Sequence, residues 1–137
     1  MRIPGLQLDV DTEAVPWRTT SAPGVRWLLL ASEAAPQPAG AAGPAAGATV
    51  LIRMEPGHGY PPHRHLDVEE VLVLAGGYRD ALGEHRAGDF VRYEPGSEHA
   101  PVALGDAARE ASHQNPACVL FATARGGIAR VAEDPAP

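Results

Sequence analysis

Short apolar segments recur along the chain and are separated by turns rich in glycine and proline. They contain many Val, Ile, Leu and aromatic residues, and they predict β-strands at residues 25–30, 48–54, 70–75, 89–93, 117–124 and 128–132. The segment EVLVLA at 70–75 is apolar at both alternating positions, so we expect protein to cover both of its faces, as in a sandwich or small barrel. No segment has a convincing helical stripe. The pattern predicts an all-β protein.

The polar segments between these strands predict turns and loops. GGYRDALGEHRAG at 76–88 is interpreted as a turn, and AAPQPAGAAGPAAG at 34–47 as a flexible loop of low complexity between two strands. With 137 residues the chain has the length of one domain with a substantial core. We therefore expect a single domain over residues 1–137, with its core at about 15–132.

Composition excludes several classes of function. The formal net charge is −6 and the isoelectric point is near 5.4, so the basic surface of a nucleic-acid-binding protein is missing. Cys118 is the single cysteine, which excludes an internal disulfide and a zinc finger built on cysteine pairs. No apolar run approaches the length of a membrane span, and the N-terminus lacks a secretory apolar region. We expect a cytoplasmic protein without nucleic-acid or membrane partners.

A cluster of ionisable residues precedes the most apolar strand, in PPHRHLDVEEVLVL at 61–74. His63 and His65 are two residues apart, so in a strand they point to the same side. Either Glu69 or Glu70 can join them, because a bend between the histidines and the glutamates leaves their relative orientation open. His99, on the turn EPGSEHAP, offers a fourth donor. Three imidazoles and a carboxylate suit Zn, Fe, Mn, Ni or Cu, whereas the histidine pair alone would equally fit a solvated loop.

Two spaced sets of residues resemble the two sequence motifs of the cupin family. The first set is Gly57, His63, His65, Glu69 and Gly76. The second set is Gly88, Pro95, Gly96 and His99. The second departs from the family pattern, because Glu94 stands at the expected proline position and Ala103 at the usual asparagine position. Over roughly residues 15–124 the chain is most similar to the cupin domain of ChrR-type anti-sigma factors and its single-domain relatives.

The resemblance implies a jelly-roll β-barrel, also called a double-stranded β-helix, closed around one metal-containing pocket. The implied ligands are His63, His65, Glu69 and His99, with Glu70 in reserve. They would hold one divalent transition metal ion per chain, Fe(II) or Zn first and Mn or Ni as further candidates. The motif glycines are expected at strand reversals that require a positive φ.

Some single-domain relatives are iron-dependent dioxygenases, so the resemblance implies a metal-dependent, dioxygenase-like oxidoreductase. Its small-molecule substrate would be a small diketone or phenolic ketone that binds the metal as an enolate. Two alternatives are a non-catalytic metal- or ligand-binding sensor module, as in the anti-sigma relatives, and a non-redox cupin isomerase or cyclase. We also expect a homodimer, in which LQLDVDTEAVPWR at 6–18 could add a strand to the neighbouring sheet.

Other side chains have less specific signals. We expect apolar pocket walls at Val71, Val73, Phe90 and Phe121, and packing or dimer contacts at Trp17 and Trp27. We expect solvated positions for His58, His85 and His113, which lie in polar stretches. Arg53 and Arg92 interrupt apolar strands. They could clamp an anionic substrate inside the barrel or simply face outward.

Overall fold

The computed structural model describes residues 1–3, 12–32 and 47–131. Within these residues the chain forms twelve strands and no helix, so the prediction of an all-β protein is confirmed. It follows that this part of the chain contains no helix able to cross a membrane.

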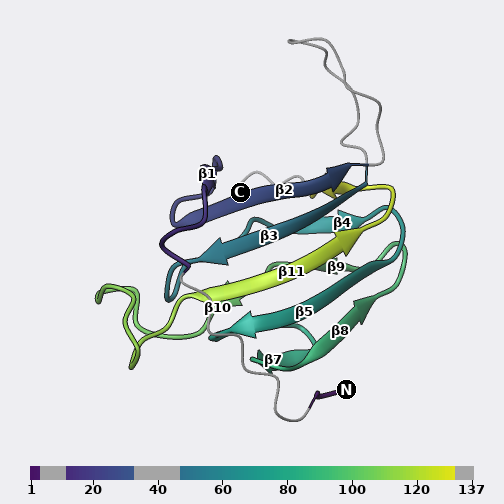
Figure 1. Cartoon of the computed structure of the whole chain (residues 1–137). Helices are drawn as coiled ribbons and strands as arrows, with labels where there is room; N and C mark the ends of the chain where they lie inside the picture. The colour runs from purple at the N-terminus through teal and green to yellow at the C-terminus, as the bar shows by residue number, and fades with distance from the viewer. Residues whose placement is uncertain (4–11, 33–46, 132–137) are drawn as a thin grey trace, which may run out of the picture.

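The strands form two layers (Figure 1). The front layer is a six-stranded antiparallel sheet in the order β1-β2-β3-β11-β5-β8. Its strands are β1 (Arg18–Thr19), β2 (Val25–Ser32), β3 (Ala48–Met54), β11 (Cys118–Ala124), β5 (Glu69–Ala75) and β8 (Phe90–Tyr93). Because β11 is inserted between β3 and β5, strands distant in sequence lie side by side, as in a jelly roll.

The back layer consists of two small sheets in the orders β10-β6-β7 and β12-β4-β9. Their strands are β10 (Val102–Ala103), β6 (Gly77–Asp80), β7 (Gly83–Arg86), β12 (Ile128–Arg130), β4 (His63–His65) and β9 (Glu98–His99). His63, His65 and His99 therefore lie on the back layer, which faces the large sheet that carries Glu69.

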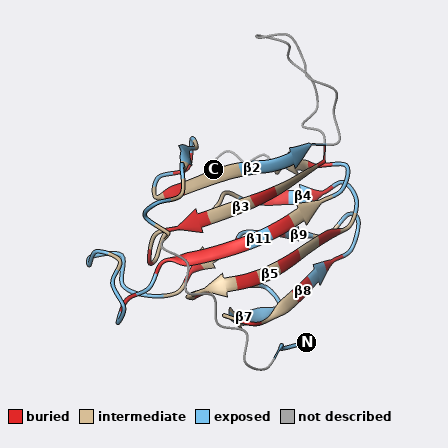
Figure 2. Cartoon of the chain, in the orientation of Figure 1, coloured by how far each residue is buried: buried red, intermediate tan, exposed pale blue. Residues whose placement is uncertain are grey.

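The core lies between the layers and is built from alternate residues of the central strands. On β11, Leu120 and Ala122 are buried, whereas Phe121 between them faces outward and is 37% exposed. On β5, Val71 and Val73 are buried in the same core. Figure 2 shows buried residues concentrated on β3, β11 and β5, which have a neighbouring strand on each side within the large sheet.

All six predicted strand segments contain a strand. The interpretation of residues 76–88 as a turn is wrong, because this segment forms the hairpin of β6 and β7. The hairpin was missed because its strands are short and mostly polar. Its alternation nevertheless places Tyr78 and the carboxyl group of Asp80 inside the molecule.

The four motif glycines have a positive φ, as the resemblance implied. Gly76 has the strictest requirement. Its φ is 61°, and a Cβ atom there would lie 2.4 Å from the carbonyl oxygen of Ala117. Only glycine therefore fits where the chain passes from β5 into β6.

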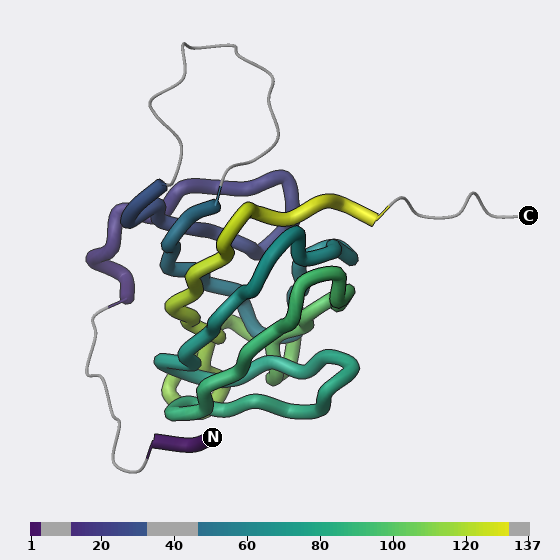
Figure 3. Tube along the Cα trace, turned by 90° about the vertical axis from the view of Figure 1, so that its right-hand side faces the viewer, coloured from purple at the N-terminus to yellow at the C-terminus, as the bar shows by residue number. Residues whose placement is uncertain are grey.

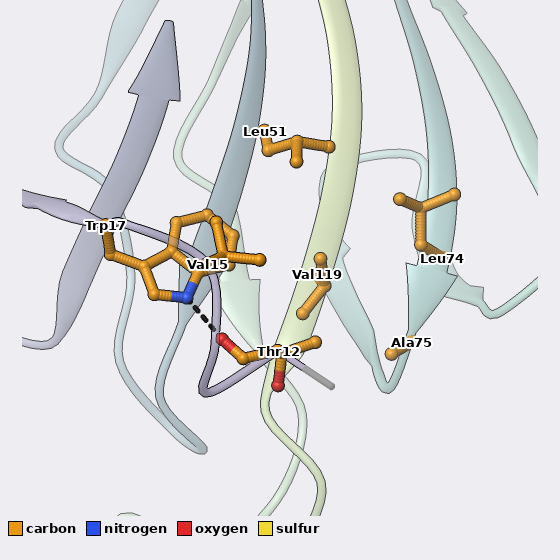
Figure 4. Close-up of a pocket in the computed structure, with 7 residues that line it drawn as sticks. All are labelled: Thr12, Val15, Trp17, Leu51, Leu74, Ala75 and Val119. Carbon is orange, nitrogen blue, oxygen red and sulfur yellow. Dashed lines mark hydrogen bonds between the residues drawn. The ribbon is translucent and has the colours of Figure 1, made fainter. Parts of the chain in front are cut away.

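The N-terminal residues contact the outside of the barrel at two places. Residues 12–17 lie against the outer face of the large sheet, where Trp17 lies near Leu51 and Val119 (Figure 4). The indole Nε1 of Trp17 donates a hydrogen bond to the carbonyl oxygen of Thr12 at 2.6 Å. This position agrees with packing, one of the two roles expected of Trp17. Residues 1–3 lie at the edge of the barrel (Figure 3). The Ile3 amide donates a hydrogen bond to the carbonyl oxygen of Gly88 at 2.8 Å.

Two predictions fall largely outside the described residues. They are the flexible loop at 34–47, of which Gly47 alone is described, and the part of the N-terminal segment at 6–11.

Candidate metal centre

The four predicted ligands lie together between the two layers. His63 and His65 come from β4, Glu69 from the first position of β5, and His99 from β9. Their potential ligand atoms all lie within 4.8 Å of one another, and all four residues are buried. The structure thus brings together the residues selected from the sequence.

Strand alternation and pairing register explain this arrangement. On β4, His63 and His65 point inward, while Arg64 between them points outward and is ion-paired with Glu98. The antiparallel pairing of β4 with β9 sets His99 directly opposite His63. Two short strands therefore present three imidazoles to one point.

Hydrogen bonds at Nδ1 fix the tautomer of each ring. His63 Nδ1 is 3.0 Å from the carbonyl oxygen of Pro61, which only accepts, so this nitrogen carries the proton. His65 Nδ1 is 2.9 Å from Ser97 Oγ, whose single proton goes to the carbonyl oxygen of Glu94. His65 is therefore also protonated at Nδ1. This leaves the lone pair of its Nε2 directed at the cluster.

His99 follows the same rule through a carboxylate. Its Nδ1 lies 2.8 Å from Asp80 Oδ2. Burial opposes ionisation of Asp80, but hydrogen bonds from His99, Tyr93 and His85 outweigh it and lower the pKa of this carboxyl group to about 2. Asp80 is thus an ionised acceptor, and His99 likewise keeps an unprotonated Nε2.

When the three imidazoles are neutral, their inward-facing nitrogens carry no protons, and this is the test of whether a metal ion fits. His63 Nε2 and His99 Nε2 are 2.9 Å apart. His65 Nε2 is buried and makes no hydrogen bond, although it lies 2.9 Å from Glu69 Oε2. Lone pairs that converge in a buried site repel one another unless a cation lies among them. Three imidazoles and one carboxylate form a donor set suited to a divalent transition metal.

Burial keeps two of the imidazoles neutral. Desolvation is the largest effect on both His63 and His99, and it lowers the pKa of each below its ordinary value. A neutral imidazole is the form that binds metal, so the protonation states agree with the donor set.

The structure distinguishes the two glutamates that the sequence left open. Glu69 is 8% exposed and its carboxylate lies in the cluster. Glu70 is the next residue along β5, so its side chain points to the opposite face, where its register partners are Thr123 and Arg92. Glu69 is therefore the glutamate that lies with the histidines.

Asp80 is the centre of a buried network that sequence reasoning missed. Its carboxylate has no exposed surface and accepts hydrogen bonds from His99 Nδ1, the Tyr93 hydroxyl and His85 Nε2. The Tyr78 hydroxyl in turn lies 2.6 Å from that of Tyr93. Since Tyr93 donates to Asp80, Tyr78 donates to Tyr93. Burial raises the pKa of both phenols, so both remain protonated donors.

This network also corrects the expectation of solvated histidines. The side chain of His85 is only 12% exposed and is bonded to Asp80. His58 is half-buried, with its Nδ1 3.1 Å from the carbonyl oxygen of Pro56, and His113 is exposed as expected. A hairpin pattern in the sequence could have revealed this network. Tyr78 and Asp80 are two residues apart on one strand and therefore face the same side, and the chain turns back at Gly83.

A cavity of about 580 Å³ adjoins the cluster, and His63, Glu69 and His99 contribute to its lining. Of the four expected walls, only Val71 lines it. Phe121 and Phe90 share register with Leu72 and lie with it on the outer face of the sheet, and Val73 is buried away from the cavity lining. Trp27 packs against the core, which is one of its two expected roles, and it is also a cavity wall, which was not expected.

Both arginines considered as substrate clamps turn away from this cavity. Arg53 is buried, but it is ion-paired with Glu55 at 3.0 Å and with Glu13 at 2.9 Å. Arg92 is exposed and pairs with Glu94 at 3.0 Å. The outward-facing alternative is therefore correct for both.

The two-layered barrel with a buried three-histidine cluster has the architecture of the cupin class. A family model described as the ChrR Cupin-like domain matches residues 7–109, and the chain therefore belongs to this family. The comparison with curated proteins gives no match.

Several solved structures share the fold. A chain from the complex of Rhodobacter sphaeroides SigE with the anti-sigma ChrR is 29% identical, with a TM-score of 0.60; the match covers 82% of this chain and 50% of that one. The present chain thus spans about half the length of the matched chain in that complex. An acetylacetone dioxygenase from Acinetobacter johnsonii is 14% identical over 80% of this chain and 65% of that one, with a TM-score of 0.59.

The polyketide cyclase RemF from Streptomyces resistomycificus is 19% identical over 93% of this chain and 87% of its own, with a TM-score of 0.58. At these identities the dioxygenase and the cyclase show the fold alone.

Proposed function

We propose that the protein is a mononuclear metalloenzyme of the cupin class. His63, His65, Glu69 and His99 would hold one divalent transition metal ion, with iron or zinc as first candidates. The observation that carries this proposal is the convergence of unprotonated Nε2 atoms, with His63 and His99 2.9 Å apart beside the orphaned Nε2 of His65.

The site is suited to an oxygen-donor substrate. A bound divalent ion would supply Lewis acidity and, as iron, redox activity toward dioxygen. One carboxylate and three neutral imidazoles leave a net charge of +1 on the centre, so a singly charged enolate would bring it to neutrality. The adjoining cavity gives such a ligand access to the cluster.

The chain's own residues would position and shield this chemistry. Asp80 holds the ring of His99 in the required tautomer, and Pro61 and Ser97 do the same for the other two rings. The apolar cavity walls exclude water from the reacting centre. Oxidative cleavage of an enolisable diketone or phenolic ketone is the reaction that this combination supports best.

The test uses untagged protein loaded with Fe(II) under anaerobic conditions and then exposed to acetylacetone. We expect a new charge-transfer band on addition of the diketone, and consumption of oxygen in air. His99→Ala should abolish both signals, while the exposed control His113→Ala should retain them.

A second candidate is a non-catalytic metal- and ligand-binding module. It is supported by the family membership and by the 29% identity to a chain of the SigE–ChrR complex. A spectrum that stays unchanged with diketone for the iron, nickel and zinc forms, without oxygen uptake, would favour this candidate. A band without oxygen uptake would favour a non-redox isomerase or cyclase.

A further inference from the structure

The cavity beside the cluster is larger than a simple diketone requires. Its volume of about 580 Å³ lies within the range of roughly 300–1,000 Å³ typical of sites that enclose drug-sized organic molecules. It extends from the cluster to the strand ends near Ser32, Ala48 and Ala124.

Its walls are predominantly apolar and come from both layers. The apolar lining residues include Trp27, Leu29, Val50, Ile52, Val71, Leu120 and Ile128. Leu29 is 45% exposed although it belongs to this wall. An apolar ligand that covered Leu29 and the neighbouring wall would remove this surface from water.

The cavity has no cation for an acidic group other than the proposed metal. The chain contains no lysine, and all eleven of its arginines lie in the described residues. None of them is a lining residue of the cavity. Arg130 is nearby, but its guanidinium lies 5.4 Å from the centre of the Tyr60 ring and donates to Ser21 Oγ at 3.0 Å.

We infer that the substrate is a bulky, apolar molecule whose only charged part is its chelating enolate, and that it binds with its oxygen donors toward the histidine cluster. This inference rests on the proposed function and makes it more specific. Burial of a carboxylate or phosphate tail without a cationic partner would be costly, so sugar acids and phosphorylated compounds do not fit. The tail itself must be apolar to match the walls.

The experiment measures binding of three ligands to the Zn(II)-loaded protein by calorimetry, so that turnover does not interfere. The ligands are acetylacetone, a β-diketone extended by a linear nonyl chain, and the same extended diketone ending in a carboxylate. Complete burial of a methylene group would strengthen binding by about fourfold. We expect the nonyl compound to bind at least about tenfold more tightly than acetylacetone, and its carboxylate analogue at least about tenfold more weakly than the nonyl compound.

Variants locate the tail in the cavity. Ala122→Leu should weaken binding of the nonyl compound more than binding of acetylacetone, because Ala122 faces the cavity from β11. Leu29→Ser makes the same test at a partly exposed position, where folding is not at risk. The matched control is Phe121→Ala, on the outward face of β11, which should change neither affinity.

The results separate this inference from the proposed function. Equal affinities for the three ligands, or tightest binding of the carboxylate, would overturn the inference while metal and diketone binding stand. If no diketone binds, the proposed function fails. In that case, metal-free protein that binds a neutral apolar dye, and binds it more weakly after Leu29→Ser, would still support the inference of an apolar ligand. Absence of dye binding would overturn this inference.

Discussion

Individual side chains determine what the candidate centre can hold. Each of the three imidazoles is tied at Nδ1 to an acceptor supplied by Pro61, Ser97 or Asp80. These bonds leave all three Nε2 atoms as acceptors, which is an unfavourable arrangement in a buried site without a cation. The sequence predicted the four donors from spacing and resemblance. It could not predict the tautomers, because they depend on partners up to 32 residues away.

The first prediction concerns the two neighbouring glutamates. Glu69→Gln should weaken Zn(II) binding by at least about tenfold, since it removes the only carboxylate of the cluster. Glu70→Gln is the matched control and should bind normally, because its side chain lies on the other face of β5. Titration calorimetry measures the Zn(II) affinity of both variants. A greater loss in Glu70→Gln than in Glu69→Gln would show that Glu70 is the ligand.

The second prediction concerns Asp80. Asp80→Asn should weaken metal binding by about 10- to 100-fold, because the carboxylate that orients His99 is lost. Affinity is the deciding measurement, compared with the exposed substitution Glu84→Gln. A lower melting temperature with unchanged metal affinity would show that Asp80 has a structural role alone.

The third prediction is the dependence of metal occupancy on pH. Protonation competes with metal at His63 and His99, whose pKa values are lowered by burial. Occupancy should therefore persist somewhat below the ordinary histidine pKa of about 6.5 and be lost at more acidic pH. In the metal-free protein, the pKa of these two histidines is lower in the folded state than in the unfolded chain. The unfolded chain therefore binds protons first as the pH drops below about 6.5, and the free energy of unfolding should decrease. Dialysis against limiting metal between neutral and acidic pH measures occupancy, and a constant value would contradict this assignment.

At the scale of elements, long apolar strands were predictable and short polar ones were not. The central strands, such as β3 and β11, are apolar on both faces and have a strong sequence signal. In contrast, β4, β6 and β9 are two to four residues long and carry histidine or aspartate inward. Their strand character comes from pairing with distant partners, which no local pattern contains.

The fourth prediction tests the junction of β5 and β6. Gly76→Ala should destabilise the protein by about 2–4 kcal/mol, because it combines a positive φ with a close contact to the Ala117 carbonyl. Gly83→Ala is a suitable comparison, since its φ is also positive but nothing lies within 4 Å of the added Cβ. Its cost should be about 1 kcal/mol. Chemical denaturation that shows equal losses would contradict the steric argument.

At the scale of the whole molecule, the sequence predicted the barrel but not the lining of its cavity. The expected walls included Phe90 and Phe121, which are the two phenylalanines of the chain. Strand register turns both outward, while the expected wall Val71 and the smaller Ala122, which was not expected, face the cavity. Small side chains at these two positions leave space on the inner face of the large sheet for the cavity of about 580 Å³.

The assembly of the molecule remains a prediction. Residues 12–17 lie against the outer face of the chain's own sheet, and β1 pairs with β2 of the same chain. We expect a homodimer, since exposed apolar residues such as Leu30 and Phe121 would be covered by a second copy. Light scattering at micromolar concentration checks this, and a monomer would contradict it.

The most direct test of the central claim is the metal content of the protein itself. Untagged protein, expressed in medium with trace metals and purified without chelators, should contain about one divalent transition metal ion per chain by elemental analysis. His63→Ala and His99→Ala should each lose most of it, while the exposed His113→Ala should not. A wild-type protein without stoichiometric metal, or variants that retain it fully, would contradict a metal centre at these residues.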